Sequence, residues 1–334
     1  MPRIALDAMG GDRAPDEIVA GALEAAANGI EVVLHGPEGL DTGGLPLVRA
    51  RETIGMAEKP AEAVRAKPDS SLVSAVRAVA DGSADVVVSA GNTGAMLAAG
   101  LLHIRRLPGV MRPAIAVPIP TRGGPSLLID GGANADSRPE HLLQFAVMGS
   151  VFCIEILGTA DPTVRLLSIG EEPEKGDQLT IEAHALLRDA AGIRFEGNAE
   201  ARDLLAGAAD VVVTDGFTGN MALKLLEGTI KELLDLLREE ISATTTGKLG
   251  GLLIRPAARR IRSRLDPDTY GGAYLLGLRG LAVIAHGSSG RRAIKNAIEL
   301  AARGAEHHVV ERLAERLPER ERREPAQAEL KDAH

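Results

Sequence analysis

The sequence predicts an α/β fold built on a mainly parallel, three-layer sheet. Short runs of β-branched residues recur along the chain, and most of them are followed by a glycine-rich turn. Stretches with the 3.6-residue periodicity of amphipathic helices lie between these runs. Nearly continuous apolar strands that alternate with helices are typical of a parallel sheet covered by helices on both faces.

Each β-branched run is expected to form a strand: Arg3–Asp7, Glu31–His35, Asp85–Ser89, Ala114–Ile119, Leu127–Asp130, Val164–Ile169, Val211–Thr214 and Leu281–Ala285. Each periodic stretch is expected to form a helix: Pro15–Ala27, Ser71–Ala80, Arg138–Glu155, Leu179–Ala190, Phe217–Ile241 and Arg291–Arg303. Ligands of such sheets bind at the carboxyl ends of the strands, so the loops after the strands are the candidate sites.

Length and composition predict one globular unit. The chain has 334 residues, of which 45% are hydrophobic, enough for a substantial core. We expect residues 1–317 to form a single α/β catalytic unit with a protruding basic segment at about 241–270. The polar tail 318–334 is expected to be disordered.

Composition also excludes several classes of function. Six aromatic residues and a net charge of -8 argue against a nucleic-acid partner. Cys153 is the single cysteine and is expected to be a buried apolar residue, which fits a reduced cytosol. Asp7 precedes any apolar run, so the N-terminus does not predict a secretory signal. No uncharged apolar run approaches the roughly 20 residues that span a bilayer.

An internal repeat marks two loops. Gly82–Met96 and Gly207–Met221 share ten of fifteen residues at an offset of 125. Each segment predicts a buried strand, a Gly-x-Thr-Gly loop and a helix, and backbone N–H groups at such a turn can bind an anion. We therefore predict two related halves that face one cleft, although the glycines could instead serve only tight turns and close helix packing.

Two further loops carry polar residues but match no nucleotide motif. Asp7-Ala8-Met9-Gly10-Gly11-Asp12 lacks the Gly-x-Gly-x-x-Gly of a dinucleotide site, and Gly247-Lys248 lacks the Ser or Thr of a Walker A loop. The loop Asp130–Asp136 precedes the segment Arg138-Pro139-Glu140-His141. This loop could orient a substrate or move a proton, or Asp136 or Ser137 could cap the next helix.

The loops after the strands near residues 169 and 285 are also polar. Lys175 lies among three acids in Ile169–Gly176, and a lone surface lysine usually has no special role. His286-Gly287-Ser288-Ser289-Gly290 lacks the spacing of a nucleophile elbow, so we expect its hydroxyl and N–H groups to bind an oxyanion. The sequence holds no HExxH motif or paired-histidine helix, and no metal or other cofactor is expected.

A basic, amphipathic stretch covers Ile241–Leu265, which contains no acid. Pro256 is expected to interrupt or begin a helix there. Such a segment can lie on an anionic membrane surface or bind an acidic protein, and it can also be an ordinary solvated face with dimer contacts. Its cations are Lys248, Arg255, Arg259, Arg260, Arg262 and Arg264.

Eight segments together carry a resemblance to a known family: ALDAMGGDRAPDEIV (5–19), SAGNTGA (89–95), PEHLLQFAVMGSVF (139–152), IGEEPEKG (169–176), GNAEARDLL (197–205), VVVTDGFTGNMALK (211–224), YGGAYLLGLRG (270–280) and AHGSS (285–289). With these segments, nearly the whole chain except the tail resembles the bacterial PlsX-type phosphate acyltransferases. Three positions depart from the family pattern: Tyr274 replaces an expected proline, Ser137 a cysteine and Ser168 an asparagine. We expect Tyr274 to alter the surface of its loop.

This resemblance implies a fold similar to those of the isocitrate and isopropylmalate dehydrogenases and the phosphotransacetylases. It implies transfer of a fatty acyl group from acyl carrier protein to inorganic phosphate, which yields acyl phosphate for phospholipid synthesis. It further implies a cytoplasmic homodimer in loose contact with the inner face of the membrane. A downstream membrane glycerol-3-phosphate acyltransferase is then a possible partner, and the basic stretch has lipid or carrier protein as its partner.

The resemblance also suggests roles for the loops. We expect phosphate to bind between the two Gly-x-Thr-Gly loops and the His286 loop, near Lys175, and to attack the thioester directly. Asn220 and Asn92 are candidates for holding the carbonyl oxygen or phosphate, and Asp215, Asp7 or His286 for handling the proton. The other candidate binding residues are Gly10, Gly11, Thr93, Gly94, Asn134, Thr218, Gly219, Ser288 and Ser289.

Three other functions stay open at this point. A phosphotransacetylase would perform the same chemistry on a short acyl-CoA. A nicotinamide dehydrogenase could share the fold. A membrane scaffold without catalytic activity could use the basic stretch alone.

Overall fold

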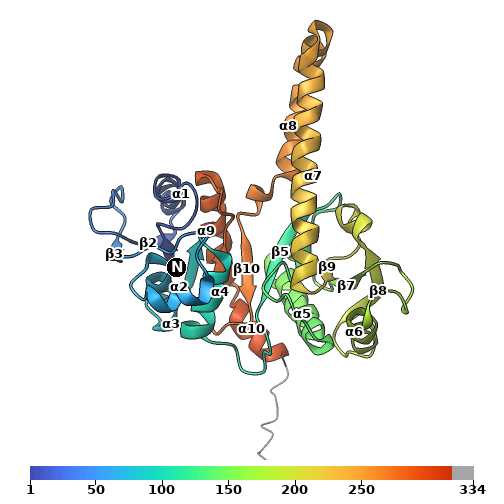
Figure 1. Cartoon of the computed structure of the whole chain (residues 1–334), viewed down its shortest axis with the longest axis horizontal. Coiled ribbons are helices and arrows are strands. Elements are labelled where there is room, and N and C mark those ends of the chain that lie inside the picture. The colour runs from blue at the N-terminus through green and yellow to red at the C-terminus, as the bar shows by residue number, and fades with distance from the viewer. Residues whose placement is uncertain (318–334) are drawn as a thin grey trace, which may run out of the picture.

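An 11-stranded sheet forms the centre of the protein in the computed structural model, which describes residues 1–317 (Figure 1). The strand order is β3-β2-β1-β4-β11-β10-β5-β6-β9-β7-β8. The strands are β1 (Arg3–Asp7), β2 (Glu31–Gly36), β3 (Leu47–Arg49), β4 (Val86–Ser89), β5 (Ala114–Pro120), β6 (Pro125–Ile129), β7 (Thr163–Ser168), β8 (Arg194–Glu200), β9 (Val211–Val213), β10 (Ala273–Leu276) and β11 (Leu281–Ile284).

The sheet is mostly parallel, but its two halves run in opposite directions. β1, β2, β3, β4 and β11 pair in parallel, and so do β6, β7, β8 and β9. Between these halves β10 is antiparallel to both β11 and β5, and β5 is antiparallel to β6. The carboxyl ends of the strands consequently point in opposite directions in the two halves.

Helices cover both faces and complete the three predicted layers. One face packs on α1, α5, α6, α9 and α10, and the other packs on α2, α3 and α4. The helices are α1 (Asp16–Ala27), α2 (Pro60–Ala66), α3 (Ser71–Ala80), α4 (Thr93–Ala99), α5 (Pro139–Phe152), α6 (Gln178–Arg188), α7 (Gly216–Ala243), α8 (Thr245–Leu265), α9 (Arg291–Glu306) and α10 (Val309–Arg316), with short helical segments η1 (Gly100–Ile104), η2 (Cys153–Leu157), η3 (Ala201–Ala206) and η4 (Pro267–Thr269).

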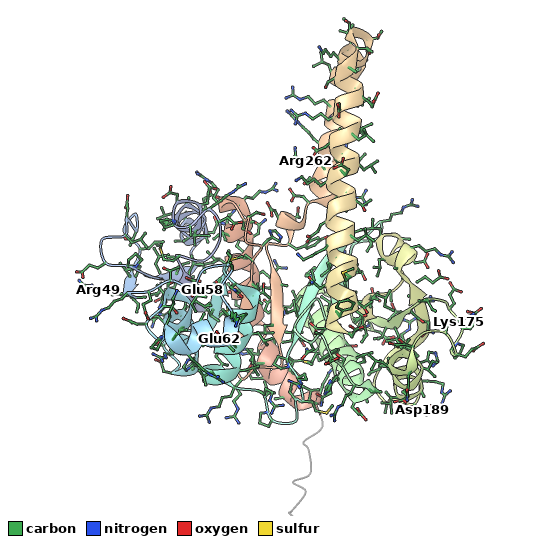
Figure 2. The ribbon with its side chains drawn as sticks, in the orientation of Figure 1. Arg49, Glu58, Glu62, Lys175, Asp189 and Arg262 are labelled. Carbon is green, nitrogen blue, oxygen red and sulfur yellow. The ribbon has the colours of Figure 1, made fainter. Side chains whose placement is uncertain are left out.

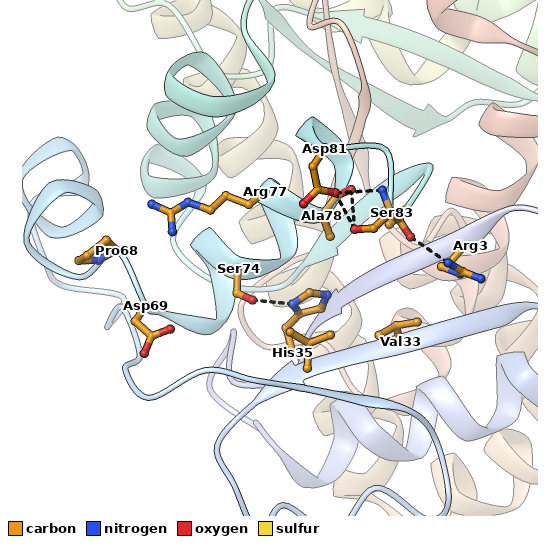
Figure 3. A pocket seen from close by; sticks show the side chains of 12 residues that line it. Arg3, Val33, His35, Pro68, Asp69, Ser74, Arg77, Ala78, Asp81 and Ser83 are labelled. Carbon is orange, nitrogen blue, oxygen red and sulfur yellow. Dashed lines mark hydrogen bonds between the residues drawn. The ribbon is translucent and has the colours of Figure 1, made fainter.

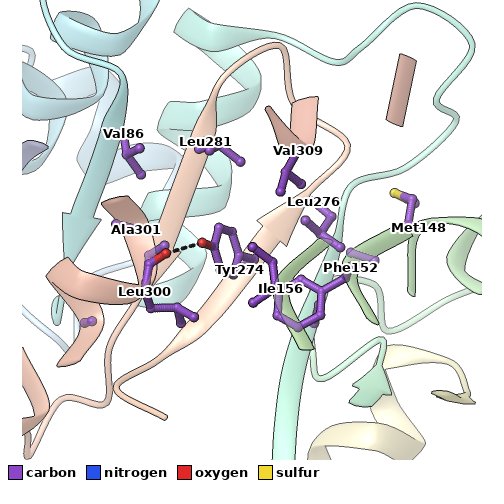
Figure 4. Close-up of a cluster of buried hydrophobic side chains, with 14 of the residues drawn as sticks. Val86, Met148, Phe152, Ile156, Tyr274, Leu276, Leu281, Leu300, Ala301 and Val309 are labelled. Carbon is purple, nitrogen blue, oxygen red and sulfur yellow. Dashed lines mark hydrogen bonds between the residues drawn. The ribbon is translucent and has the colours of Figure 1, made fainter. Parts of the chain in front are cut away.

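Tyr274 lies in the core where β10 joins the two halves (Figure 4). Its ring is fully buried, packs edge-on against Phe152 at 5.2 Å between ring centroids, and its hydroxyl donates to the carbonyl of Leu300 on α9. The expectation that Tyr274 alters a loop surface is therefore wrong. Cys153 is also fully buried, as predicted, and burial raises the pKa of its thiol.

A helical hairpin of α7 and α8 projects far from the sheet (Figure 1). The protrusion thus includes α7 as well as the predicted basic segment. α8 continues through Pro256, so the expectation that this proline interrupts or begins a helix is wrong. The proline removes one backbone hydrogen bond from the helix. Because no residue of α8 is buried, the carbonyl left without a donor can bond to water instead.

Several elements differ from the sequence prediction. The structure adds β3, β8, β10, α2 and α10, which the sequence periodicity did not indicate, and it confirms as α4 the helix predicted after the first Gly-x-Thr-Gly loop. α5 and η2 together form one helix, Pro139–Leu157, that is long and apolar enough to cross a membrane, but 67% of its most apolar window is buried against the rest of the fold. The predicted disordered tail 318–334 lies outside the described residues.

Candidate functional site

The loops after β1, β4 and β11 meet in a first group, here called the Asp7 cluster. Asp7 is 2% exposed and accepts hydrogen bonds from Ser89 Oγ (2.7 Å) and from the N–H of Met9 (3.2 Å). Burial raises the pKa of its carboxyl. Gly10 packs so closely on this carboxyl that a Cβ there would lie 2.5 Å from Asp7 Oδ2. Asp7 therefore organises the loop and is buried away from any ligand.

Asn92 is likewise used by the fold. Its Oδ1 caps α4 by accepting from Ala95 N (3.0 Å), and its Nδ2 donates to the carbonyls of Met56 and Glu58 (3.1 Å each). Both polar atoms of Asn92 are therefore engaged by the fold in this structure, and its contact with a substrate oxygen stays a prediction. Gly94 allows close contact with Pro60, where a Cβ would lie only 2.5 Å from Pro60 Cγ, whereas the neighbouring Thr93 is exposed.

The loop after β11 lies beside the loop after β1. Asp12 N donates to Gly287 O (2.8 Å), and Gly11 has φ +105° at this close approach. His286 and Ser288 are exposed, and His286 Nδ1 lies 2.8 Å from Ser288 Oγ. Ser289 is only 3% exposed. The exposed side chains of the Asp7 cluster therefore include Thr93, Ser288 and His286 together with an acid and a cation, Asp12 and Arg13, from the loop after β1.

A second group, here called the Asp130 cluster, forms after β6 and β9. Asp130 is fully buried, and burial raises the pKa of its carboxyl. Its two oxygens accept hydrogen bonds of 2.8–3.1 Å from the N–H groups of Ile115, Gly132, Ala133 and Asn134 and from Asn134 Nδ2. Asn134 Nδ2 also donates to Pro113 O at 2.7 Å. Both side chains of the predicted loop thus hold the backbone, and neither offers a free donor.

The start of α7 packs on this loop. Asp215 Oδ1 accepts from the N–H groups of Phe217 and Thr218 (2.9 Å each), while Gly216 N donates to Asn134 O and Gly219 N to Asp215 O. These four N–H groups already have acceptors in this structure, so anion binding by the second Gly-x-Thr-Gly loop stays a prediction without support from free N–H groups there. A Cβ at Gly219 would lie 2.0 Å from Asp130 O, so this glycine serves close packing.

Asn220 and Thr218 remain available in the first turns of α7. Both side chains are exposed, and neither makes a hydrogen bond within residues 1–317. Asn220 Cβ lies beside Gly132, where an added Cβ would be 3.3 Å away. The Asp130 loop therefore fixes the base of Asn220 and leaves its amide free.

Lys175 lies in the turn after β7, the strand next to β9, and is exposed on the outer side of this half (Figure 2). β7 and β9 are parallel, so the Lys175 turn and the start of α7 share one edge of the sheet. Among residues 1–317 no ion pair engages its ammonium group. Lys175 is thus a free cation at the same edge as Asn220.

The two clusters follow strands that lie apart in the sheet. β4 and β9 are five strand positions apart, about 24 Å at the usual spacing between strands. The carboxyl ends of these two strands point in opposite directions, although Ala133 of the Asp130 loop packs against the buried cluster that includes Ala95 of α4. One cleft between the two Gly-x-Thr-Gly loops stays a prediction.

The predicted basic residues lie together on α8, and Figure 2 labels Arg262 on the hairpin. All six cations are exposed, and Arg264 Nη2 donates to Arg122 O at 3.1 Å. Exposed apolar side chains accompany them, including Leu253 at 83% and Leu252 at 64% exposure. The hairpin therefore presents both charge and apolar surface to solvent.

A groove of about 340 Å³ lies between α3 and β2, away from both clusters (Figure 3). None of its lining residues belongs to the predicted site. Burial lowers the pKa of His35 there to about 4, and His35 Nδ1 lies 2.8 Å from Ser74 Oγ. Within residues 1–317, no three His, Cys, Asp or Glu side chains are grouped as a metal would require.

The fold belongs to a class that includes acyl-transferring enzymes. The branched-chain phosphotransacylase of Enterococcus faecalis aligns with a TM-score of 0.59 at 19% identity, covering 92% of this chain and 100% of that one. The EutD phosphotransacetylase of Staphylococcus aureus gives 0.57 at 17% identity, with 91% and 94% covered. A 4-hydroxythreonine-4-phosphate dehydrogenase of Klebsiella pneumoniae gives 0.53 at 15% identity, with 93% and 100% covered. These similarities establish the fold alone.

Sequence comparison identifies the family. The family described as fatty acid synthesis protein matches residues 2–312. A phosphate acyltransferase of Heliobacterium modesticaldum is 46% identical over 328 residues, and one of Desulfitobacterium hafniense strain DCB-2 is 47% identical over 327 residues; each alignment covers 95% of this chain and 98% of the relative. The chain belongs to this PlsX family of fatty acid synthesis proteins and is an acyltransferase.

Proposed function

We propose that the protein transfers a fatty acyl group reversibly from acyl carrier protein to inorganic phosphate, forming acyl phosphate for phospholipid synthesis. The observation that carries this proposal is full-length similarity to phosphate acyltransferases in a chain that keeps Lys175 and Asn220 exposed and free. The folds of phosphotransacylases, which are similar, favour the same class of chemistry.

The reaction needs no covalent acyl-enzyme. A phosphate oxygen attacks the thioester carbonyl carbon, the carbon–sulfur bond breaks, and the proton of the attacking hydrogen phosphate ends on the departing thiolate. The products are acyl phosphate and the carrier thiol. Since phosphate is itself a nucleophile near neutral pH, positioning and charge stabilisation supply most of the rate.

The free side chains suggest the roles. Lys175 neutralises the phosphate, and the Asn220 amide donates to the carbonyl oxygen as negative charge develops there. Asp7 is buried, and Asp215 caps α7, so the exposed His286 is the better candidate for handing the proton to the thiolate. Thr93 and Ser288 supply hydroxyl donors beside it.

A homodimer would let these groups act together. The Asp7 cluster carries His286, and the Asp130 cluster lies beside Lys175 and Asn220 at the other edge of the sheet. Phe217, Met221 and Leu225 are 59–72% exposed at four-residue spacing on α7, next to Asn220. Burying this apolar stripe against a second copy favours association and would bring the Asp7 cluster of one protomer to Asn220 of the other.

The hairpin supplies the contact with macromolecules. The α8 cations suit acidic acyl carrier protein or an anionic membrane, and the exposed leucines beside them favour a membrane surface. We place the protein in the cytoplasm, peripherally on the inner face of the cell membrane, where acyl phosphate would pass to a membrane glycerol-3-phosphate acyltransferase.

The test is phosphate-dependent release of free thiol from a long-chain acyl carrier protein, with acyl phosphate trapped by hydroxylamine and no metal or nucleotide added. Product formation supports the proposal, and Lys175→Ala should weaken phosphate use while the fold persists. Consumption of short acyl-CoA alone would indicate a phosphotransacetylase instead. Vesicle binding without turnover would indicate a scaffold, and an absorbance change with nicotinamide cofactor would indicate a dehydrogenase.

A further inference from the structure

The turn that carries Lys175 is fixed at both of its backbone groups. Lys175 N donates to Glu172 O at 3.0 Å, and Ser168 Oγ donates to Lys175 O at 3.0 Å. Ser168 is the last residue of β7, so this second bond ties the turn to the sheet. These two hydrogen bonds fix the backbone of the turn, so the fold determines the direction in which the exposed Lys175 side chain leaves it.

The stem of Lys175 lies against Gly170. A Cβ added at Gly170 would lie 2.9 Å from Lys175 Cγ and 3.0 Å from Glu172 Oε2. The lysine side chain therefore passes over the Gly170 backbone, and a larger residue at this position would require the side chain of Lys175 to move.

Asn198 connects this turn to the neighbouring strand. Its side chain is 2% exposed, and its Nδ2 donates to Glu172 O at 2.8 Å. This carbonyl is the one that also accepts from Lys175 N, and a carbonyl has two lone pairs for two such donors. One oxygen thus joins the β8 side chain to the backbone of Lys175.

A β-bulge directs Asn198 to that position. Val164 pairs with Phe195 and Leu166 pairs with Asn198, so β8 contains one residue more than β7 over this span. The extra residue places Asn198 on the face of Phe195, which packs on His184 of α6 at 5.1 Å. Without it, the two-residue alternation would turn Asn198 to the opposite face. Gly197, at φ +90°, supplies the conformation that the bulge requires.

We propose that Asn198 is a positioning residue for Lys175 in acyl transfer. The inference rests on the proposed function, because Lys175 has its role only there. Asn198 holds the Glu172 carbonyl, the carbonyl holds the Lys175 N–H, and the turn then presents the ammonium group to phosphate. The proposal assigns a role to Asn198 within the segment GNAEARDLL (197–205).

The experiment is a double-mutant cycle on the full-length protein with long-chain acyl carrier protein and inorganic phosphate. Asn198→Ala should raise the KM for phosphate about tenfold, as loss of one well-placed hydrogen bond does, with a smaller change in kcat. In a Lys175→Ala background the same change should add little, because Asn198 acts through Lys175. Asn28→Ala removes an amide that donates to Glu299 at 2.7 Å elsewhere and should leave the KM for phosphate unchanged.

The outcomes separate the two claims. No turnover by the unaltered protein would overturn the proposed function and this inference together. Turnover with an unchanged KM for phosphate in Asn198→Ala, or with independent effects of the two substitutions, would overturn the positioning role alone. If Asn198→Ala does not fold, Ser168→Ala removes the other bond to Lys175 from a half-buried site, and the same cycle applies to it.

Discussion

His35 makes stability depend on pH below neutrality. The unfolded side chain titrates near 6.5, whereas burial lowers the folded pKa to about 4. Between these values the unfolded chain binds the extra proton, so this group should remove about 3 kcal/mol of stability as the pH falls from 6.5 to 4. Urea unfolding of the wild type and His35→Gln across this range measures it.

Comparing the wild type with His35→Gln separates the effect of His35 on stability from the effects of other titrating groups. Burial raises the pKa of Asp7 and Asp130, so these carboxyls have the opposite sign: their contribution to stability falls as the pH rises above 3.8. Both carboxyls are present in the wild type and in His35→Gln. An equal pH dependence in the two proteins would contradict the assignment to His35.

Tyr274 is a second residue whose burial predicts a measurable effect. Tyr274→Phe removes the hydroxyl that donates to Leu300 O and should lower the free energy of unfolding by about 1–2 kcal/mol. Tyr274→Ala also opens a cavity beside Phe152, and about 3–5 kcal/mol is expected. Chemical denaturation measures both. Tyr270→Phe, at a half-exposed site, is the matched control; a loss as large as that of Tyr274→Phe would contradict the argument.

For single residues, the sequence predicted which loops are polar but not what each side chain in them does. Asp7, Asn92, Asn134 and Asp215 were predicted to meet substrate, and in the structure their polar atoms bond to neighbouring backbone and side chains. Asp130, with five donors, was recognised only as part of its loop. A motif shows which residue types follow a strand. The hydrogen bonds that engage their polar atoms depend on the geometry of the loop, and residue spacing does not encode that geometry.

At the scale of single elements, α8 is the helix with the clearest internal weakness. Pro256 lacks the N–H that would bond to Leu252 O, and the helix is exposed throughout. Pro256→Ala restores this donor and should stabilise α8 by about 1–3 kcal/mol. Amide hydrogen exchange in residues 249–260 should then slow at least about tenfold, with unchanged exchange in α9 as the internal control. Unchanged exchange in α8 would contradict this prediction.

The elements that the sequence missed share a physical cause. β8 contains Glu196, Gly197 and Asn198, and its bulge breaks the alternation that identifies a strand. β3 has three residues at the sheet edge, and α2 has seven, too few for a clear period. The predicted strands are apolar because both of their faces are covered, which is why their pattern alone was enough to place them.

At the scale of the molecule, strand direction decides how the site can assemble. The repeat predicted two equivalent loops correctly, but periodicity carries no information on β10 and β5, the strands that reverse the second half. The reversal points the loop that carries His286 and the loops that carry Lys175 and Asn220 in opposite directions along the strands. A site to which two protomers contribute is the arrangement that this reversal favours.

Mixed dimers test this directly. His286→Ala and Lys175→Ala homodimers should each turn over far more slowly than the wild type at a phosphate concentration below saturation, with activity that stays measurable. In a dimer with one copy of each, purified through two different tags, one of the two composite sites regains both intact groups, so about half of wild-type activity should return. The control is a dimer of Lys175→Ala with Asn220→Ala. Because Lys175 and Asn220 lie at the same edge of the sheet, neither composite site in this dimer is intact. This control dimer should stay as slow as the homodimers. A His286→Ala and Lys175→Ala pair that is equally slow would mean that each protomer works alone.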